Sequence, residues 1–81
     1  NRVVPAAQLM ETVAAWAGPL ATGPTLAYGL TKRAMNHAWN TDLFGALEYE
    51  AHLQEIAGRS HDNKEGVTAF LEKREAQFKG E

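Results

Sequence analysis

Apolar residues recur at helical spacing along most of the chain, and strand-like alternation is absent beyond the first few residues. The pattern falls into four ranges, at about 5–21, 24–39, 41–57 and 62–74. Pro5 and Pro24 stand at the first two starts, where proline suits the first helical position. The sequence therefore predicts an all-α fold of about four short helices in a single helical domain that spans residues 1–81.

Interruptions in the pattern predict where the helices bend or end. Pro19 follows Gly18 within the first range, and because proline lacks a backbone donor and crowds the preceding turn, we expect a kink or a new turn there. Asn40 or Thr41 is expected to cap the third helix. Gly58 is expected to close that helix in the left-handed conformation.

The last helix has its own starting signal. Asp62 and Glu65 are three residues apart and resemble a capping box, while Ser60 fits a turn or a cap. The apolar stripe that follows has i, i+3 and i+4 spacing and consists of Val67, Phe70 and Leu71. We expect a short amphipathic helix that ends in the basic pair Lys73 and Arg74, where the helix dipole favours cations.

Composition narrows the range of functions. The chain has 81 residues, is 44% hydrophobic and has no cysteine, which excludes disulfides and Cys-type zinc sites and fits a cytoplasmic location. Its formal net charge of −2 argues against nucleic acid as a partner, and no apolar run approaches the roughly 18 residues that would span a membrane. Because the chain starts at Asn1 rather than at a methionine, we expect it to be a piece of a longer protein.

No catalytic or metal-binding constellation is recognisable in the sequence. His37, His52 and His61 share no metal-ligand spacing and are expected to be surface or hinge residues. Glu48 and Glu50 lie on opposite sides of a helix, so they cannot form a carboxylate pair. The other acids expected on a solvated face are Glu55, Glu65 and Glu72. We expect no catalytic residue and no metal site in this chain.

The basic end of the last helix is the one candidate binding site. Its residues are Phe70, Lys73, Arg74, Phe78 and Lys79. Cations beside an aromatic ring suit an anionic ligand with a planar ring, such as a nucleotide. A charged helix end is also commonly a solvated face, so both interpretations stand on chemistry alone. The apolar excess of the second helix further predicts an interface, either with another domain or in a dimer or higher oligomer.

The closing string resembles the C-terminus of the crotonase superfamily, the enoyl-CoA hydratase/isomerase family. The residues that carry the resemblance are DNKEGVTAFLEKR at 62–74 and FKG at 78–80, with weaker matches at 2–5, 23–32 and 47–54. The resemblance implies the helical C-terminal (oligomerisation) region of a crotonase-like fold without its N-terminal domain of ββα repeats. In the family, that larger domain holds the oxyanion-hole amides and the acidic catalytic residues, so the resemblance implies that this piece alone is inactive.

The resemblance also implies roles for the last helix. In the family this region builds trimer contacts, and its last helix helps to cover the acyl-CoA. By motif position, Phe70 would pack beside the adenine end of CoA and Lys73 would approach its phosphates, whereas Arg74 would give structural support. The implied parent is a homo-oligomer, a trimer or a dimer of trimers, with the CoA thioester as substrate and no cofactor.

The reaction implied by the resemblance is hydration or a double-bond or ring isomerisation. Both would proceed through a thioester enolate that an oxyanion hole outside this chain stabilises. Residues 58–62 look closest to bacterial hydratase/isomerases, including the ring-rearranging isomerases of the phenylacetate pathway. The alternative is a non-catalytic helical oligomerisation or interaction module with no CoA role.

Overall fold

The computed structural model describes all 81 residues and confirms the predicted all-α fold. A short 3-10 helix at Ala6–Gln8 precedes α1 at Leu9–Ala21, α2 at Thr25–Ala38, α3 at Leu43–Arg59 and α4 at His61–Glu72. No residue lies in a β-strand. Residues 73–81, called the tail below, follow α4 without regular secondary structure.

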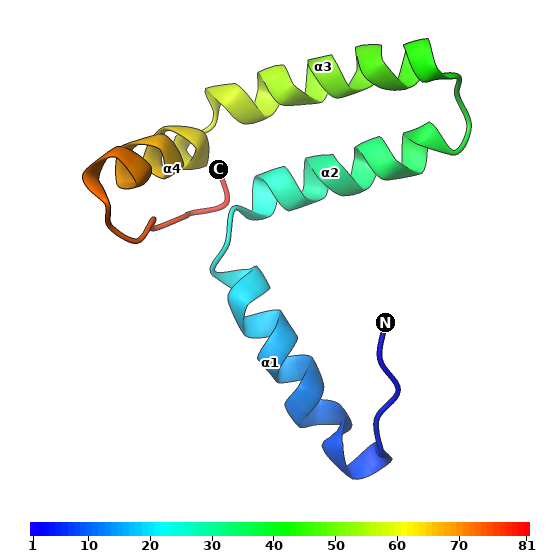
Figure 1. The fold of residues 1–81 in the computed structure, drawn as a ribbon, viewed down its shortest axis with the longest axis vertical. Helices are drawn as coiled ribbons and strands as arrows, with labels where there is room; N and C mark the ends of the chain where they lie inside the picture. Colours follow the sequence, from blue (N-terminus) through cyan, green and yellow to red (C-terminus); the bar gives the residue numbers. More distant parts are fainter.

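The helices form an open arrangement rather than a bundle (Figure 1). α2 and α3 lie antiparallel and side by side, α4 continues from α3, and α1 extends away from the other helices as a separate arm (Figure 1). The radius of gyration is 16.1 Å. A compact domain of this length would have a radius of roughly 12 Å, so the chain does not close around one core.

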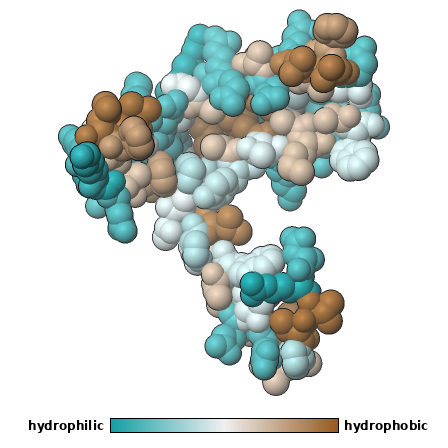
Figure 2. Space-filling model, viewed as in Figure 1, coloured by the Kyte–Doolittle hydropathy of each residue, from teal (hydrophilic) through white to brown (hydrophobic).

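The buried core is correspondingly small. Only Leu30, Leu53 and Ala69 are buried among the apolar residues, on α2, α3 and α4 respectively. Figure 2 shows apolar side chains gathered at the surface over both the α2–α3 pair and the α1 arm. The strongly exposed apolar residues include Met10, Met35, Trp39, Leu43, Phe44 and Phe70. This much exposed apolar surface is typical of an interface, which agrees with the apolar excess seen in the sequence.

Pro19 and the start of α3 differ from the prediction. α1 runs through Pro19 without starting a new turn there, and it ends at Ala21. Asp42, rather than Asn40 or Thr41, caps α3, because its carboxylate accepts a hydrogen bond from the Gly45 amide at 2.8 Å. Asn40, Thr41 and Asp42 are all residue types that can cap a helix, so the start of α3 was predicted one or two residues too early.

The junction between α3 and α4 has a single capping residue. Ser60 has an extended backbone; its hydroxyl accepts from the Asn63 amide at 3.0 Å and donates to the Ala57 carbonyl at 2.7 Å. The predicted cap role of Ser60 is confirmed. The prediction that Gly58 closes α3 is wrong, since α3 continues through it and turns directly into α4 at Ser60. No left-handed residue is needed at such a direct turn.

Candidate functional site

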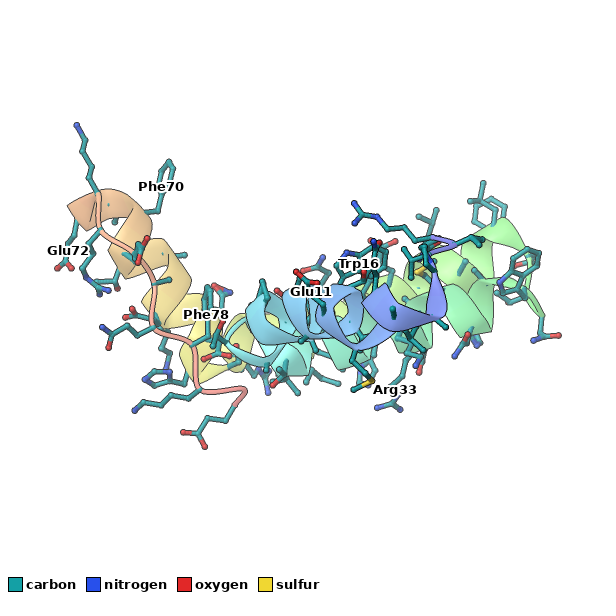
Figure 3. All side chains as sticks on the ribbon, turned by 90° about the horizontal axis from the view of Figure 1, so that it is seen from below. Glu11, Trp16, Arg33, Phe70, Glu72 and Phe78 are labelled. Atoms are coloured by element: carbon teal, nitrogen blue, oxygen red, sulfur yellow. The ribbon has the colours of Figure 1, made fainter.

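The tip of α4, defined as Phe70 and Lys73, exposes both of its side chains to solvent. Phe70 is 82% exposed. Figure 3 shows its ring projecting from the helix, on a different side from Glu72. The ammonium group of Lys73 takes part in no hydrogen bond or ion pair of the chain, and its side chain is exposed. An exposed aromatic ring and an uncommitted cation therefore lie at the same end of α4.

Lys73 also terminates α4 in an unusual backbone conformation. It lies in the left-handed region with φ 55° and ψ 40°, and it is the one non-glycine residue of the chain with a positive φ. Its amide donates to Phe70, and the Arg74 amide donates to the Ala69 carbonyl at 3.0 Å. This conformation costs a residue with a side chain about 1 kcal/mol. The turn reverses the chain, so the tail runs back along α4 (Figure 1).

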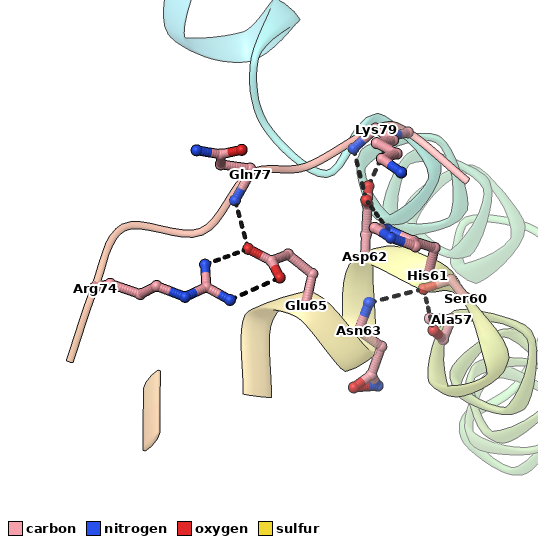
Figure 4. Close-up of polar contacts among 10 residues, drawn as sticks. Ala57, Ser60, His61, Asp62, Asn63, Glu65, Arg74, Gln77 and Lys79 are labelled. Atoms are coloured by element: carbon pink, nitrogen blue, oxygen red, sulfur yellow. Dashed lines mark hydrogen bonds and ion pairs between the residues drawn. The ribbon is translucent and has the colours of Figure 1, made fainter. Parts of the chain in front are cut away.

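Asp62 holds the far end of the tail against the start of α4 (Figure 4). Its carboxylate accepts from the Lys79 amide at 2.7 Å and from the Gly80 amide at 2.8 Å, and its own amide donates to the Glu81 oxygen. Burial by itself raises the pKa of Asp62, but these two amides and His61 outweigh it, so the pKa lies below its ordinary value. The predicted capping box is wrong, because Ser60 caps α4 and Asp62 binds the tail instead.

Glu65 holds the first half of the tail through Arg74 and Gln77 (Figure 4). Both terminal guanidinium nitrogens of Arg74 contact the Glu65 carboxylate, at 2.6 and 3.0 Å, and the Gln77 amide donates to it at 2.8 Å. Arg74 Nε also contacts Glu72 at 2.6 Å. The hydrogen bonds from Arg74, then Gln77, lower the pKa of Glu65 to about 2. The expectation that Glu65 is solvated is therefore wrong, whereas Arg74 has the supporting role that the resemblance implies.

The five residues of the predicted basic site do not converge. Lys79 is attached through its amide to Asp62 at the start of α4, remote from the tip. The Phe78 ring packs on Gly66, where an added Cβ would lie 3.6 Å from it. Arg74 is committed to carboxylates, which leaves Phe70 and Lys73 as the only pair available to a ligand.

The backbone conformation and packing at residue 80 favour a glycine. The φ of Gly80, 81°, lies in the left-handed region, and an added Cβ there would clash with the Thr25 hydroxyl oxygen. The tail thus packs against the start of α2 as well as against α4. Phe78 and Pro24 line a groove at this junction. The tail therefore connects helices that are distant in sequence.

The histidines and acids form no further cluster in the structure. No group of three or more His, Asp or Glu side chains is placed to hold a metal ion. The His37 ring stacks against Tyr49 with centroids 4.2 Å apart, and His61 Nδ1 lies 3.6 Å from the Asp62 carboxylate. None of the helices combines the length and apolarity needed to cross a bilayer.

Acidification is expected to release the tail from α4. Both Asp62 and Glu65 have a lower pKa folded than unfolded, so their stabilisation is complete above the ordinary carboxylate pKa and is lost as the pH falls through the folded value. For Glu65 that window runs from 4.5 down to about 2. The measurement is the amide chemical shift of Gln77 against pH, which should titrate near the lower value.

An Asp62→Asn variant should release the tail end at neutral pH, because one carboxylate oxygen becomes a donor that faces a backbone amide. The Lys79 and Gly80 amide shifts would then move toward values of a disordered chain. Glu75→Gln is the matched control, since the exposed Glu75 side chain has no hydrogen bond or ion pair. Unchanged Lys79 and Gly80 shifts in Asp62→Asn would contradict the assigned role.

Comparisons with known proteins place this geometry in a family. The family profile described as Enoyl-CoA hydratase/isomerase matches residues 1–81. A 1,2-epoxyphenylacetyl-CoA isomerase of Escherichia coli is 46% identical over 79 residues, which cover 98% of this chain and 30% of that protein. A crotonyl-CoA hydratase of Syntrophomonas wolfei is 40% identical over 78 residues, covering 96% of this chain and 30% of that protein.

Solved structures give the same result. An enoyl-CoA hydratase of Geobacillus kaustophilus matches with a TM-score of 0.94 at 41% identity, covering 100% of this chain and 31% of that one. An enoyl-CoA hydratase of Bacillus anthracis matches with a TM-score of 0.86 at 34% identity, covering 98% of this chain and 31% of that one. The chain spans about 30% of the length of these relatives, so it corresponds to the helical region of their fold. The predicted fold class and resemblance are confirmed: the chain belongs to the enoyl-CoA hydratase/isomerase family.

Proposed function

We propose that this chain is the C-terminal region of a bacterial enzyme that hydrates or isomerises acyl-CoA thioesters. The enolate intermediate would be stabilised by an oxyanion hole outside this chain, which itself supplies no catalytic residue. Family membership supports the substrate class, and the two reaction types match the names of its isomerase and hydratase relatives. The proposed enzyme uses no cofactor, because the CoA thioester is itself the substrate. Its proposed location is the cytoplasm.

The tip of α4 carries the proposed CoA contact. Phe70 would pack beside the adenine ring and Lys73 would approach the CoA phosphates. The observation that supports this is the exposure of both side chains beside an Arg74 that is already paired. An exposed ring can stack on a base, and a free ammonium group can pair with a phosphate.

Subunit assembly is the second part of the proposal. The exposed apolar residues of α1, α2 and α3 are suited to pack against the remainder of the enzyme and against other subunits. The enzyme would be a homo-oligomer, a trimer or a dimer of trimers, and the isolated chain a dimer or higher oligomer. The alternative, a helical interaction module without a CoA role, rests on the same apolar surface. The two functions differ only in whether the tip binds CoA.

Replacing Lys73 tests the CoA contact. In the full-length enzyme, Lys73→Ala is expected to weaken CoA binding about tenfold, which corresponds to the loss of one charge-assisted contact. The measurement is the CoA dissociation constant by isothermal titration calorimetry. Lys64→Ala is the matched control, because Lys64 is an exposed cation in the first half of the same helix and should leave the constant unchanged. Equal affinity of wild type and Lys73→Ala would favour the interaction module.

A further inference from the structure

The left-handed turn at Lys73 raises the question of what holds it. Glycine is the usual residue at the position that closes a helix in this conformation, because it has no Cβ. A strained residue persists only where the surrounding structure determines its conformation. The turn at Lys73 should therefore have neighbours on both sides that keep it in place.

Arg74, the residue after Lys73, is held by two carboxylates, Glu65 and Glu72. Glu65, in the middle of α4, accepts from the Arg74 guanidinium and from the Gln77 amide. Glu72, in the last turn of α4, contacts Arg74 Nε on the other side of the guanidinium. The chain is thus fixed immediately before and after Lys73. A two-nitrogen contact with a carboxylate has a defined geometry, which a single point charge would not impose.

The contacts with Glu65 and Glu72 distinguish Arg74 from its neighbour Lys73. The positive charge of Arg74 is compensated by two carboxylates, and its side chain is held on the tail side of α4. Lys73 has no such partner, so an anion that reaches the tip meets this ammonium group alone. Of these two adjacent cations, Arg74 is therefore committed to the structure, and Lys73 is available to a ligand.

We propose that Glu65 and Arg74 are positioning residues that orient the Lys73 turn toward the phosphates of CoA. This inference rests on the proposed CoA role of Lys73 and extends it to residues that do not touch the ligand. Without the Glu65–Arg74 pair, the turn would sample several conformations, and binding would have to order Lys73 again. That ordering opposes affinity for the part of the ligand that carries the phosphates.

The test compares two probes in the full-length enzyme, CoA and pantetheine, which lacks the nucleotide and its phosphates. Glu65→Gln keeps the size of the side chain but loses its charge, and it is expected to weaken CoA binding about fivefold. Pantetheine binding should not change, because pantetheine has no group for Lys73. Dissociation constants from calorimetry for CoA and from NMR titration for pantetheine provide the comparison.

A second variant covers the case in which Glu65→Gln fails to fold. Arg74→Lys keeps the charge but removes the two-nitrogen contact, so it should give the same selective loss of CoA affinity. Glu75→Gln is the matched control: it removes an exposed acid of the tail and should change neither constant. Circular dichroism verifies that each variant retains its helices.

The outcomes separate the inference from the proposed function. A selective loss of CoA affinity in Glu65→Gln and Arg74→Lys supports the positioning role. An effect of Lys73→Ala without any effect of these two variants overturns the positioning role and leaves the CoA site intact. Equal losses for CoA and pantetheine mean that Glu65 only supports folding, which also overturns it. If Lys73→Ala itself leaves CoA binding unchanged, the proposed function fails, and the inference fails with it.

Discussion

Purified alone, the 81-residue chain is expected to show no enoyl-CoA hydration or isomerisation. The reaction needs a general base or acid whose pKa lies near the working pH, together with backbone amides aimed at the thioester oxygen. Hydrogen bonds and an ion pair hold the carboxylates of Asp62 and Glu65. Their pKa values lie below the ordinary range. They are accordingly weak bases, and their oxygens are occupied by amides of the tail and by Arg74.

The measurement for this prediction is the loss of enoyl-thioester absorbance from crotonyl-CoA and the appearance of isomerised product by mass spectrometry. The full-length enzyme at the same concentration is the positive control. Turnover by the 81-residue chain above the rate without protein would overturn the assignment of catalysis to residues outside it.

Leu53→Ala is expected to be the most destabilising single substitution of the apolar core. Leu53 is 4% exposed and lines the interface between α2 and α3 together with Leu30. Truncation of a buried leucine costs about 2–5 kcal/mol, and the lower end, about 2 kcal/mol, is expected because this interface opens into a groove that can partly close. A loss of that size removes a large part of the stability of a chain with so small a core.

Chemical denaturation of the 81-residue chain followed by circular dichroism measures this loss. Leu43→Ala is the matched control, since Leu43 is 69% exposed on the same helix and should change the free energy of unfolding by only about 0.5 kcal/mol or less. Equal losses in the two variants would show that the α2–α3 contact does not carry the stability of the fold.

The sequence predicted the helices well because periodicity and breaker residues act locally. The four helices follow from the spacing of apolar residues, and Ser60 is a cap of the expected type. Helix ends were less predictable where several residues compete for one role. Asn40, Thr41 and Asp42 can all cap α3, and the structure uses the last of them.

The contacts of the tail could not be predicted from local patterns. Glu65 meets Arg74 nine residues later, and Asp62 meets the Gly80 amide eighteen residues later, only because the chain reverses at Lys73. A left-handed lysine gives no signal in the sequence, since lysine rarely adopts this conformation. The glycine at the end of the chain was the one available indication of the packed tail. The backbone at Gly80 has a positive φ and packs closely against Thr25, and both features favour glycine.

The candidate binding residues were indicated by the motif rather than by charge and aromaticity. Charge and aromaticity alone grouped five residues near the end of the chain, and the structure separates Phe78 and Lys79 from the tip. The resemblance singled out Phe70 and Lys73, whose ligand role remains a prediction. Their shared exposure is the structural property that such a role requires.

A crystal structure of the full-length enzyme with CoA bound would show directly whether the tip of α4 contacts the nucleotide. We expect the Phe70 ring in van der Waals contact with the adenine and Lys73 Nζ within ion-pair distance of a CoA phosphate. A nucleotide bound against another surface, with the tip of α4 still facing solvent, would rule out the proposed CoA contact.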